Sequence, residues 1–200
     1  MTSTHSLLGR AMLVAAAGLV MVLTACTGRG GGQLPPSAGF SGPASFGFSF
    51  SCEDKGGLNP QTGQLKIQLS YTDHGNSLLD SAFGIHGIVD TIEPIEESMI
   101  CIGQNPPPGG NELIFLGRYY LTSSAPSGFP STCPTRDSAT TPLCRFEVIV
   151  RDNDNNGAPS SGDYFHIALS SGTAPTTELD LATVFYTRGG TLSSGNLTVD

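Results

Sequence analysis

The stretch Phe146-Glu-Val-Ile-Val-Arg151 decides how the chain folds, together with Tyr164-Phe-His-Ile-Ala-Leu169 further along. In both stretches a large apolar residue occupies every second position. A period of two is the pattern of a β-strand that buries one face. The segment between them, 152–163, is polar and rich in Asp, Asn and Gly, which are turn residues. The two stretches therefore predict an antiparallel hairpin.

The same alternation extends outward from this hairpin in both directions. Leu65 to Tyr71 places its apolar residues on one face, and Glu112 to Leu121 is apolar on both faces, as expected for the centre of a sheet. We find no convincing amphipathic helix of ten or more residues. Short strands separated by turn residues predict an all-β fold, a β-sandwich or a related barrel of about eight or nine antiparallel strands. The remaining predicted strands are 46–52, 83–92, 99–103, 181–187 and 191–199. The last two predict a second hairpin around Gly189-Gly190, and Ser193-Ser194-Gly195 is a further candidate turn in this segment.

A secretory signal precedes these strands. Arg10 is followed by an apolar run from Ala11 to Leu23, and small residues come next. The run is shorter than the ~20 apolar residues that a transmembrane helix needs. Leu23-Thr24-Ala25-Cys26 matches the lipobox of a bacterial lipoprotein, so we expect cleavage before Cys26 and a diacylglycerol on its thiol. The alternative is an ordinary signal peptide followed by an incidental cysteine.

This signal predicts where the protein resides. Acyl chains on Cys26 would hold the chain on the extracytoplasmic side of a bacterial membrane, since two or more chains anchor a protein stably. In an envelope with two membranes, Thr27 after the cysteine favours the outer one. Residues 26–200 carry 8 basic and 17 acidic side chains, a balance of −9. That balance argues against nucleic acid as a partner, because phosphate contacts need clustered Lys and Arg.

The chain divides into three parts on this interpretation. Residues 1–25 are the signal peptide. Residues 26–45 are rich in Gly, Pro and Ser and predict a flexible tether between the lipid and the domain. Residues 46–200 are the predicted β-sandwich domain, which is long enough for one hydrophobic core.

The cysteines predict two disulfides. With Cys26 lipidated, four remain, an even number in an oxidising compartment. Cys133 and Cys144 bracket a polar, proline-containing loop, so we pair them locally, which leaves Cys52 with Cys101. A zinc site is the alternative, but no Cys-x-x-Cys spacing is present.

Six short motifs follow one another along the predicted domain: Gly63-Gln-Leu65, Tyr71-Thr-Asp-His74, Ile85-His-Gly-Ile-Val89, Phe146 to Asp152, Gly162 to Ile167 and Gly189 to Val199. Taken in this order, they resemble a small β-rich domain of unknown function found in secreted bacterial proteins, often after surface-anchoring modules. The longer second strand, the loop at 122–142 and Ala158-Pro159-Ser160 depart from that pattern. The resemblance implies a β fold and an extracellular setting, and it implies no catalytic residue.

The polar loop at 152–163 is the best candidate metal site. Asp152, Asp154, Asn156 and Asp163 follow the ligand spacing of a calcium loop, with Gly157 at the sixth position. Oxygen ligands suit Ca²⁺, although the flanking segments are predicted strands rather than helices. The alternative is a hairpin loop in which Asp, Asn and Gly serve only as turn residues.

Other polar residues offer a second class of function. Asp73, His74 and His86 would form an acid–base or metal cluster if their strands pair, with His166 and Glu96 as further candidates. Scattered histidines on strands are more often packing or hydrogen-bonding residues. The chain contains no Gly-x-Ser-x-Gly and no His-Glu-x-x-His motif, and it has no Trp.

The sequence therefore predicts a lipid-anchored extracytoplasmic module without enzymatic activity, structural or binding in role, with a protein or glycan partner at the cell surface. The competing prediction is a cell-envelope hydrolase that uses carboxylates and histidines in the loops between strands.

Overall fold

The computed structural model describes residues 27–53, 64–75, 79, 81–88, 111–137, 142–153, 162–174 and 179–199. Within these residues, nine β-strands form one antiparallel sheet, and a short 3-10 turn, η2, covers Leu181–Thr183. The predicted all-β class is therefore confirmed. The strands are β1 Thr27–Leu34, β2 Ala44–Glu53, β3 Gln64–Asp73, β4 Phe83–Ile88, β5 Glu112–Leu121, β6 Cys144–Arg151, β7 Tyr164–Ser170, β8 Val184–Thr191 and β9 Ser194–Val199.

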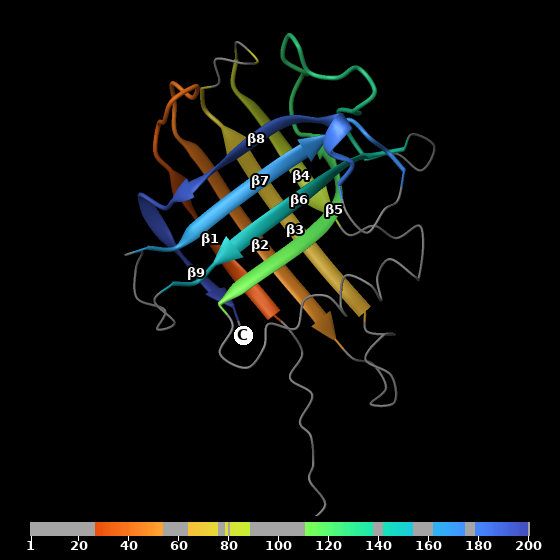
Figure 1. Cartoon of the computed structure of the whole chain (residues 1–200). Coiled ribbons are helices and arrows are strands. Elements are labelled where there is room, and N and C mark those ends of the chain that lie inside the picture. The colour runs from red at the N-terminus through yellow and green to blue at the C-terminus, as the bar shows by residue number, and fades with distance from the viewer. Residues whose placement is uncertain are drawn as a thin grey trace, which may run out of the picture.

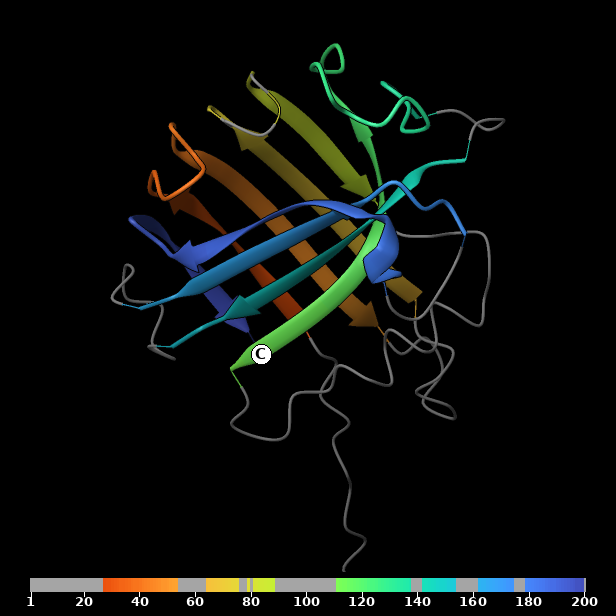
Figure 2. The same cartoon turned by 45° about the horizontal axis from the view of Figure 1, so that its top comes forward.

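The sheet curls over so that its two halves pack face to face. Its strand order is β8-β7-β6-β5-β4-β3-β2-β1-β9, in which every neighbour follows in sequence except the pair β1 and β9. In Figures 1 and 2, β5 to β8 form one layer that lies across the layer of β1 to β4 and β9. One corner lies at β4 and β5, which pair only over Ile85–Ile88 and Arg118–Leu121.

The second corner is the passage from β8 to β9. The N–H of Leu192 donates to the carbonyl of Asp163 beside β7, at 2.9 Å, and the N–H of the next residue, Ser193, donates to the carbonyl of Gln33 in β1, also at 2.9 Å. Two consecutive residues thus bond to the two layers. The chain crosses from one end of the sheet order to the other and brings the layers together.

Alternating side chains fill the space between the layers. In β6 the positions Phe146, Val148 and Val150 are fully buried, as the period of two predicts. Phe46 of β2 stacks on Phe165 of β7 with ring centroids 3.7 Å apart, which joins the two layers directly. Burying one such ring contributes about 1.5–3 kcal/mol, so this contact between the layers stabilises the fold.

The hairpin predicted around residues 152–163 is confirmed, since β6 and β7 pair in register from Phe146 with Leu169 to Arg151 with Tyr164. The hairpin predicted around Gly189-Gly190 is wrong. Those glycines lie inside β8, and β8 and β9 stand at opposite ends of the strand order. The segment 99–103, predicted as a strand, lies outside the described residues.

The predicted tether is also wrong over Thr27–Leu34, which is strand β1 in the body of the sheet. β1 pairs with β2 from Thr27 with Ser51 to Leu34 with Ala44, and with β9 on its other side. Glycine allows β1 and β9 to approach each other closely. Gly195 of β9 has φ +111°, and a Cβ there would collide with the carbonyl oxygen of Gly31 in β1. The sheet therefore already includes residues 27–34 and does not start near residue 46.

Candidate functional site

A buried ion pair joins the two layers at the end of β3. The Nη1 atom of Arg188 in β8 lies 2.9 Å from Oδ1 of Asp73, and the two side chains are only 1 % and 0 % exposed. Oδ1 of Asp73 also accepts the N–H of Gly75 at 2.9 Å. A charge this deeply buried needs its partner, because removing it from water alone costs several kcal/mol.

Two tyrosines extend the pair into a hydrogen-bonded chain. The hydroxyl of Tyr186 in β8 donates to Oδ2 of Asp73 at 2.5 Å, and it lies 2.5 Å from the hydroxyl of Tyr71 in β3. Since the proton of Tyr186 goes to the carboxylate, Tyr71 donates to Tyr186. Burial raises the pKa of Tyr186 and of Tyr71 above the ordinary value, so both hydroxyls stay protonated in the folded protein.

The connection between β1 and β2, residues 35–43, closes over this cluster. The Nη2 atom of Arg188 donates to the carbonyl of Gly42 at 2.7 Å and to that of Pro35 at 3.1 Å. The guanidinium also lies over the ring of Phe40, with Cζ 4.6 Å from the centroid, and Phe40 meets Tyr186 edge-on. The cluster thus fixes three parts of the chain to one another: β3, β8 and residues 35–43.

This arrangement suits a structural role. Both carboxylate oxygens of Asp73 and the hydroxyl of Tyr186 are engaged within the protein. Among the described residues, Nε of Arg188 is buried without a hydrogen-bond partner, and Nη1 meets Asp73 only as an ion pair. The network leaves the carboxylate enclosed by protein groups, whereas general acid–base catalysis needs a carboxylate that can reach a substrate proton.

The predicted acid–base residues do not come together in one place. Asp73 is buried in the ion pair, whereas Nε2 of His74 lies at the surface, 3.0 Å from the hydroxyl of Ser45. His86 packs against Tyr120, with ring centroids 5.3 Å apart. His166 lies on the opposite face of β7 from the buried Phe165 and Ile167, and burial lowers its pKa. Glu96 is outside the described residues.

The two outer residues of the candidate calcium loop bind the backbone of β9. Oδ2 of Asp163 accepts the N–H of Leu197 at 2.9 Å, and Oδ2 of Asp152 accepts the N–H of Val199 at 3.4 Å. Oδ1 of Asp163 accepts the N–H of Asn153 at 3.2 Å. Asp152 and Asp163 are 3 % and 0 % exposed. Their carboxylates accept the backbone N–H groups of β9 that the carbonyl groups of a neighbouring strand would otherwise accept.

The inner residues of that loop, Asp154 and Asn156, are outside the described residues, so the calcium site stays a prediction beside the plain hairpin loop. In the part of the chain that the structure covers, no group of three or more His, Cys, Asp or Glu side chains could hold a metal ion.

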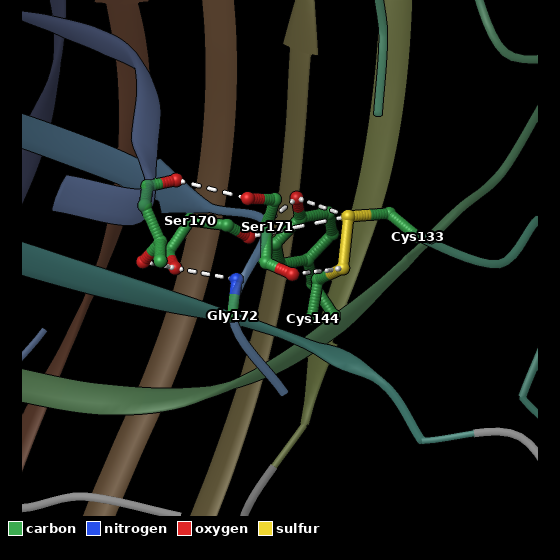
Figure 3. Close-up of a disulfide and its surroundings, with 7 residues drawn as sticks. Cys133, Cys144, Ser170, Ser171 and Gly172 are labelled. Carbon is green, nitrogen blue, oxygen red and sulfur yellow. Dashed lines mark hydrogen bonds between the residues drawn. A yellow bond between two sulfur atoms is a disulfide. The ribbon is translucent and has the colours of Figure 1, made fainter. Parts of the chain in front are cut away.

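The disulfide between Cys133 and Cys144 is formed, as predicted. Figure 3 shows it beside Ser170, the last residue of β7, and Ser171, the residue after it. The hydroxyl of Tyr119 donates to Sγ of Cys133 at 3.4 Å and to the carbonyl of Ser170 at 3.2 Å. The bridge thereby ties the loop after β5 to the start of β6.

The same loop places an aromatic ring at the end of the core. Phe129, which is 8 % exposed, meets Phe83, Tyr119 and Phe185 with ring centroids 5.5, 6.4 and 4.9 Å apart. The disulfide and Phe129 together close this end of the space between the layers.

The other predicted cysteine roles fall outside what the structure describes. Cys52 lies in β2, but its side chain is not described, and Cys101 and Cys26 are outside the described residues. The pairing of Cys52 with Cys101 and the lipidation of Cys26 remain predictions. In the described part of the chain, no helix has the length and apolar character needed to cross a bilayer.

No family model, no curated protein and no solved structure matches the chain. The resemblance to a small secreted β-rich domain therefore remains a prediction from the motifs. The most organised polar feature of the fold, the chain from Tyr71 through Tyr186 to Asp73 and Arg188, was not anticipated from the sequence. Only Asp73 was singled out there, since Arg188 lies 115 positions away and has no motif around it.

Proposed function

We propose that this chain is a bacterial lipoprotein, held on the extracytoplasmic face of a membrane through acyl chains on Cys26. The lipobox at Leu23-Thr24-Ala25-Cys26 is the sequence basis. The observation that supports it most is that every described strand, from β1 onward, lies after Cys26. A signal peptide removed before Cys26 would leave every described strand intact.

Under this proposal the domain sits close to the bilayer. β1 begins at Thr27, so few residues would separate the lipid from the folded sheet. Figures 1 and 2 show the start of β1 and the end of β9 at one end of the domain. The connecting segments 35–43 and 122–137 lie at the opposite end. The first end would face the membrane and the second would face outward.

We assign the domain a structural or binding role without enzymatic activity. The burial of Asp73 in its ion pair, apart from His74 and His86 on the outer face of the sheet, supports this role over the hydrolase alternative. The disulfide and the ion pair hold the outward-facing connections in fixed positions, as suits a surface that presents loops to a protein or glycan partner.

The anchor can be tested with one substitution in bacterial cells. Cys26→Ser removes the acyl acceptor, so the protein should either keep residues 1–25 uncut or leave the detergent phase after temperature-induced phase separation. Thr24→Ser is the matched control, since it makes the same type of small change beside the cysteine and keeps the thiol. Partition of the Cys26→Ser protein into detergent, with normal loss of the signal, would contradict the proposal.

A further inference from the structure

The two strands at the ends of the sheet order, β8 and β9, differ in whether protein groups bind the backbone of their outer edges. An edge strand exposes a row of unpaired N–H and C=O groups, onto which another strand can add. β9 has β1 on one side, and on its other side Asp163 and Asp152 accept the N–H groups of Leu197 and Val199. That edge is therefore occupied by carboxylates.

The free edge of β8 can be located from its hydrogen-bonding alternation. Leu192, just after β8, donates to Asp163 on the β7 side, and Ser193 donates in the opposite direction, to Gln33. Backbone groups in an antiparallel ladder alternate between the two sides from one residue to the next. Thr187, Gly189 and Thr191 therefore share the direction of Ser193 and point away from β7. Among the described residues, none hydrogen-bonds to these outward backbone groups.

This edge lacks the features that usually block strand addition. Thr187, Gly189 and Thr191 are all exposed and uncharged, and β8 contains no proline. Its one charged residue, Arg188, points inward to Asp73. Residues 35–43 reach β8 through the inward side chains of Arg188 and Tyr186.

We propose that β8 is an interaction surface that binds a second copy of this chain by antiparallel β8–β8 pairing. Thr187, Gly189 and Thr191 give the same order, Thr-x-Gly-x-Thr, in both chain directions. A two-fold axis at Gly189 therefore places Thr187 of each copy opposite Thr191 of the other. Opposed threonines are a favourable cross-strand pair. Gly189 lies at the axis and adds no side chain to the outer face, where a Cβ would collide with His166. The neutral edge also keeps charged groups out of the contact between two chains whose residues 27–200 each carry 8 basic and 17 acidic side chains, a balance of −9.

The test is the mass of the chain from residue 27 to 200, which contains every described strand, measured by sedimentation equilibrium over a range of concentrations. We expect a dimer that dissociates on dilution. Thr187→Lys with Thr191→Lys brings like charges into direct opposition across the axis, which should weaken dimerisation by about tenfold or more. The control is Gln68→Lys with Ser70→Lys, which adds the same charge at exposed positions of the central strand β3 and should leave dimerisation unchanged.

Amide hydrogen exchange on the unsubstituted chain gives a readout that does not depend on how well the lysine variants fold. The N–H groups of Thr187, Gly189 and Thr191 should exchange more slowly at concentrations at which the dimer forms. A monomer at every concentration would overturn the proposal. A dimer that leaves these three amides unprotected, or that both lysine pairs weaken equally, would also overturn it and would place the interface elsewhere on the domain.

Discussion

Arg188 and Asp73 form an ion pair at 2.9 Å inside the protein, 115 positions apart in sequence and on opposite layers of the curled sheet. The pair sets the position of β8 against β3 and, through the carbonyls of Pro35 and Gly42, the position of the connection between β1 and β2. The stability of the domain should therefore depend on both partners together.

Removing one partner should cost more than removing both. Asp73→Ala leaves the Arg188 charge buried without its counter-ion, which should lower the free energy of unfolding by roughly 3–5 kcal/mol. The double variant Asp73→Ala with Arg188→Met removes both charges and should be more stable than the Asp73→Ala variant. Urea unfolding of the two single variants and the double variant measures the coupling.

Asp137→Ala is the control for this cycle, because it removes an exposed carboxylate and should change stability by less than about 0.5 kcal/mol. Strictly additive losses from Asp73→Ala and Arg188→Met would show that the ion pair does not join the layers.

The buried tyrosines predict a loss of stability in alkali. Burial raises the pKa of Tyr71, Tyr119 and Tyr186 in the folded protein, whereas in the unfolded chain each ionises near its ordinary value of about 10. Above that pH the unfolded state loses protons that the folded state keeps. Stability is therefore full below about pH 10 and falls as the pH rises further.

Tyrosinate absorbance followed against pH checks this expectation. The three buried tyrosines should ionise together with the loss of folded structure seen by circular dichroism. Tyr119→Phe removes one of the three buried tyrosines. It should therefore reduce the absorbance change of that step and make the loss of stability above about pH 10 smaller. Complete ionisation of all tyrosines while the circular dichroism spectrum stays folded would contradict the buried placement.

The disulfide should hold the loop after β5 more than the rest of the domain. Cys133→Ser with Cys144→Ser opens a bridge of sequence separation 11, which should cost about 2–3 kcal/mol. We expect trypsin to cleave the variant after Arg136, an exposed residue in that loop, faster than it cleaves the unsubstituted chain. Arg29 in β1 is the internal control, and cleavage there should not change.

Peptide mapping without reductant tests the second bridge in the same preparation. We predict a peptide that joins Cys52 to Cys101 beside the peptide that joins Cys133 to Cys144. A peptide that joins Cys52 to Cys133 or to Cys144 would contradict both assignments.

The carboxylate of Asp163 should matter whether or not an ion is bound. Asp163→Ala leaves the buried N–H of Leu197 without its acceptor, so the free energy of unfolding should fall by about 1–3 kcal/mol in chelator as well as in calcium.

Asp154→Ala distinguishes the calcium site from the plain hairpin loop. If the loop binds calcium, millimolar calcium raises the melting temperature of the chain from residue 27 to 200, and Asp154→Ala abolishes the rise. Equal melting curves in calcium and chelator would leave the plain hairpin loop.

The alternating strands could be predicted from the sequence because their side chains carry the signal. Phe146, Val148 and Val150 face the core while the residues between them do not, and that difference is visible in the sequence itself. The strand β1 could not be found in this way. Gly30, Gly31 and Gly32 have no side chains to alternate, and the same composition is typical of a linker.

The site residues show a second limit. The local pairing of Cys133 with Cys144 followed from a short loop, and the structure contains it. The partnership of Asp73 with Arg188 depends on how the sheet curls, which no short pattern records. The strands of His74 and His86 do pair, and both side chains lie on the outer face of the sheet, but His86 stands opposite Ser70 of β3 and not opposite His74. Asp73 points to the core instead, because successive side chains of a strand alternate between its two faces.

Mass spectrometry of the N-terminal peptide from the protein isolated from bacterial membranes tests the lipoprotein assignment most directly. Trypsin cleaves after Arg29, so the peptide Cys26-Thr-Gly-Arg29 should be recovered with a diacylglycerol on its thiol and with residues 1–25 absent. The recovery of residues 1–25 still joined to an unmodified Cys26, or of a mature N-terminus at another position, would contradict the account.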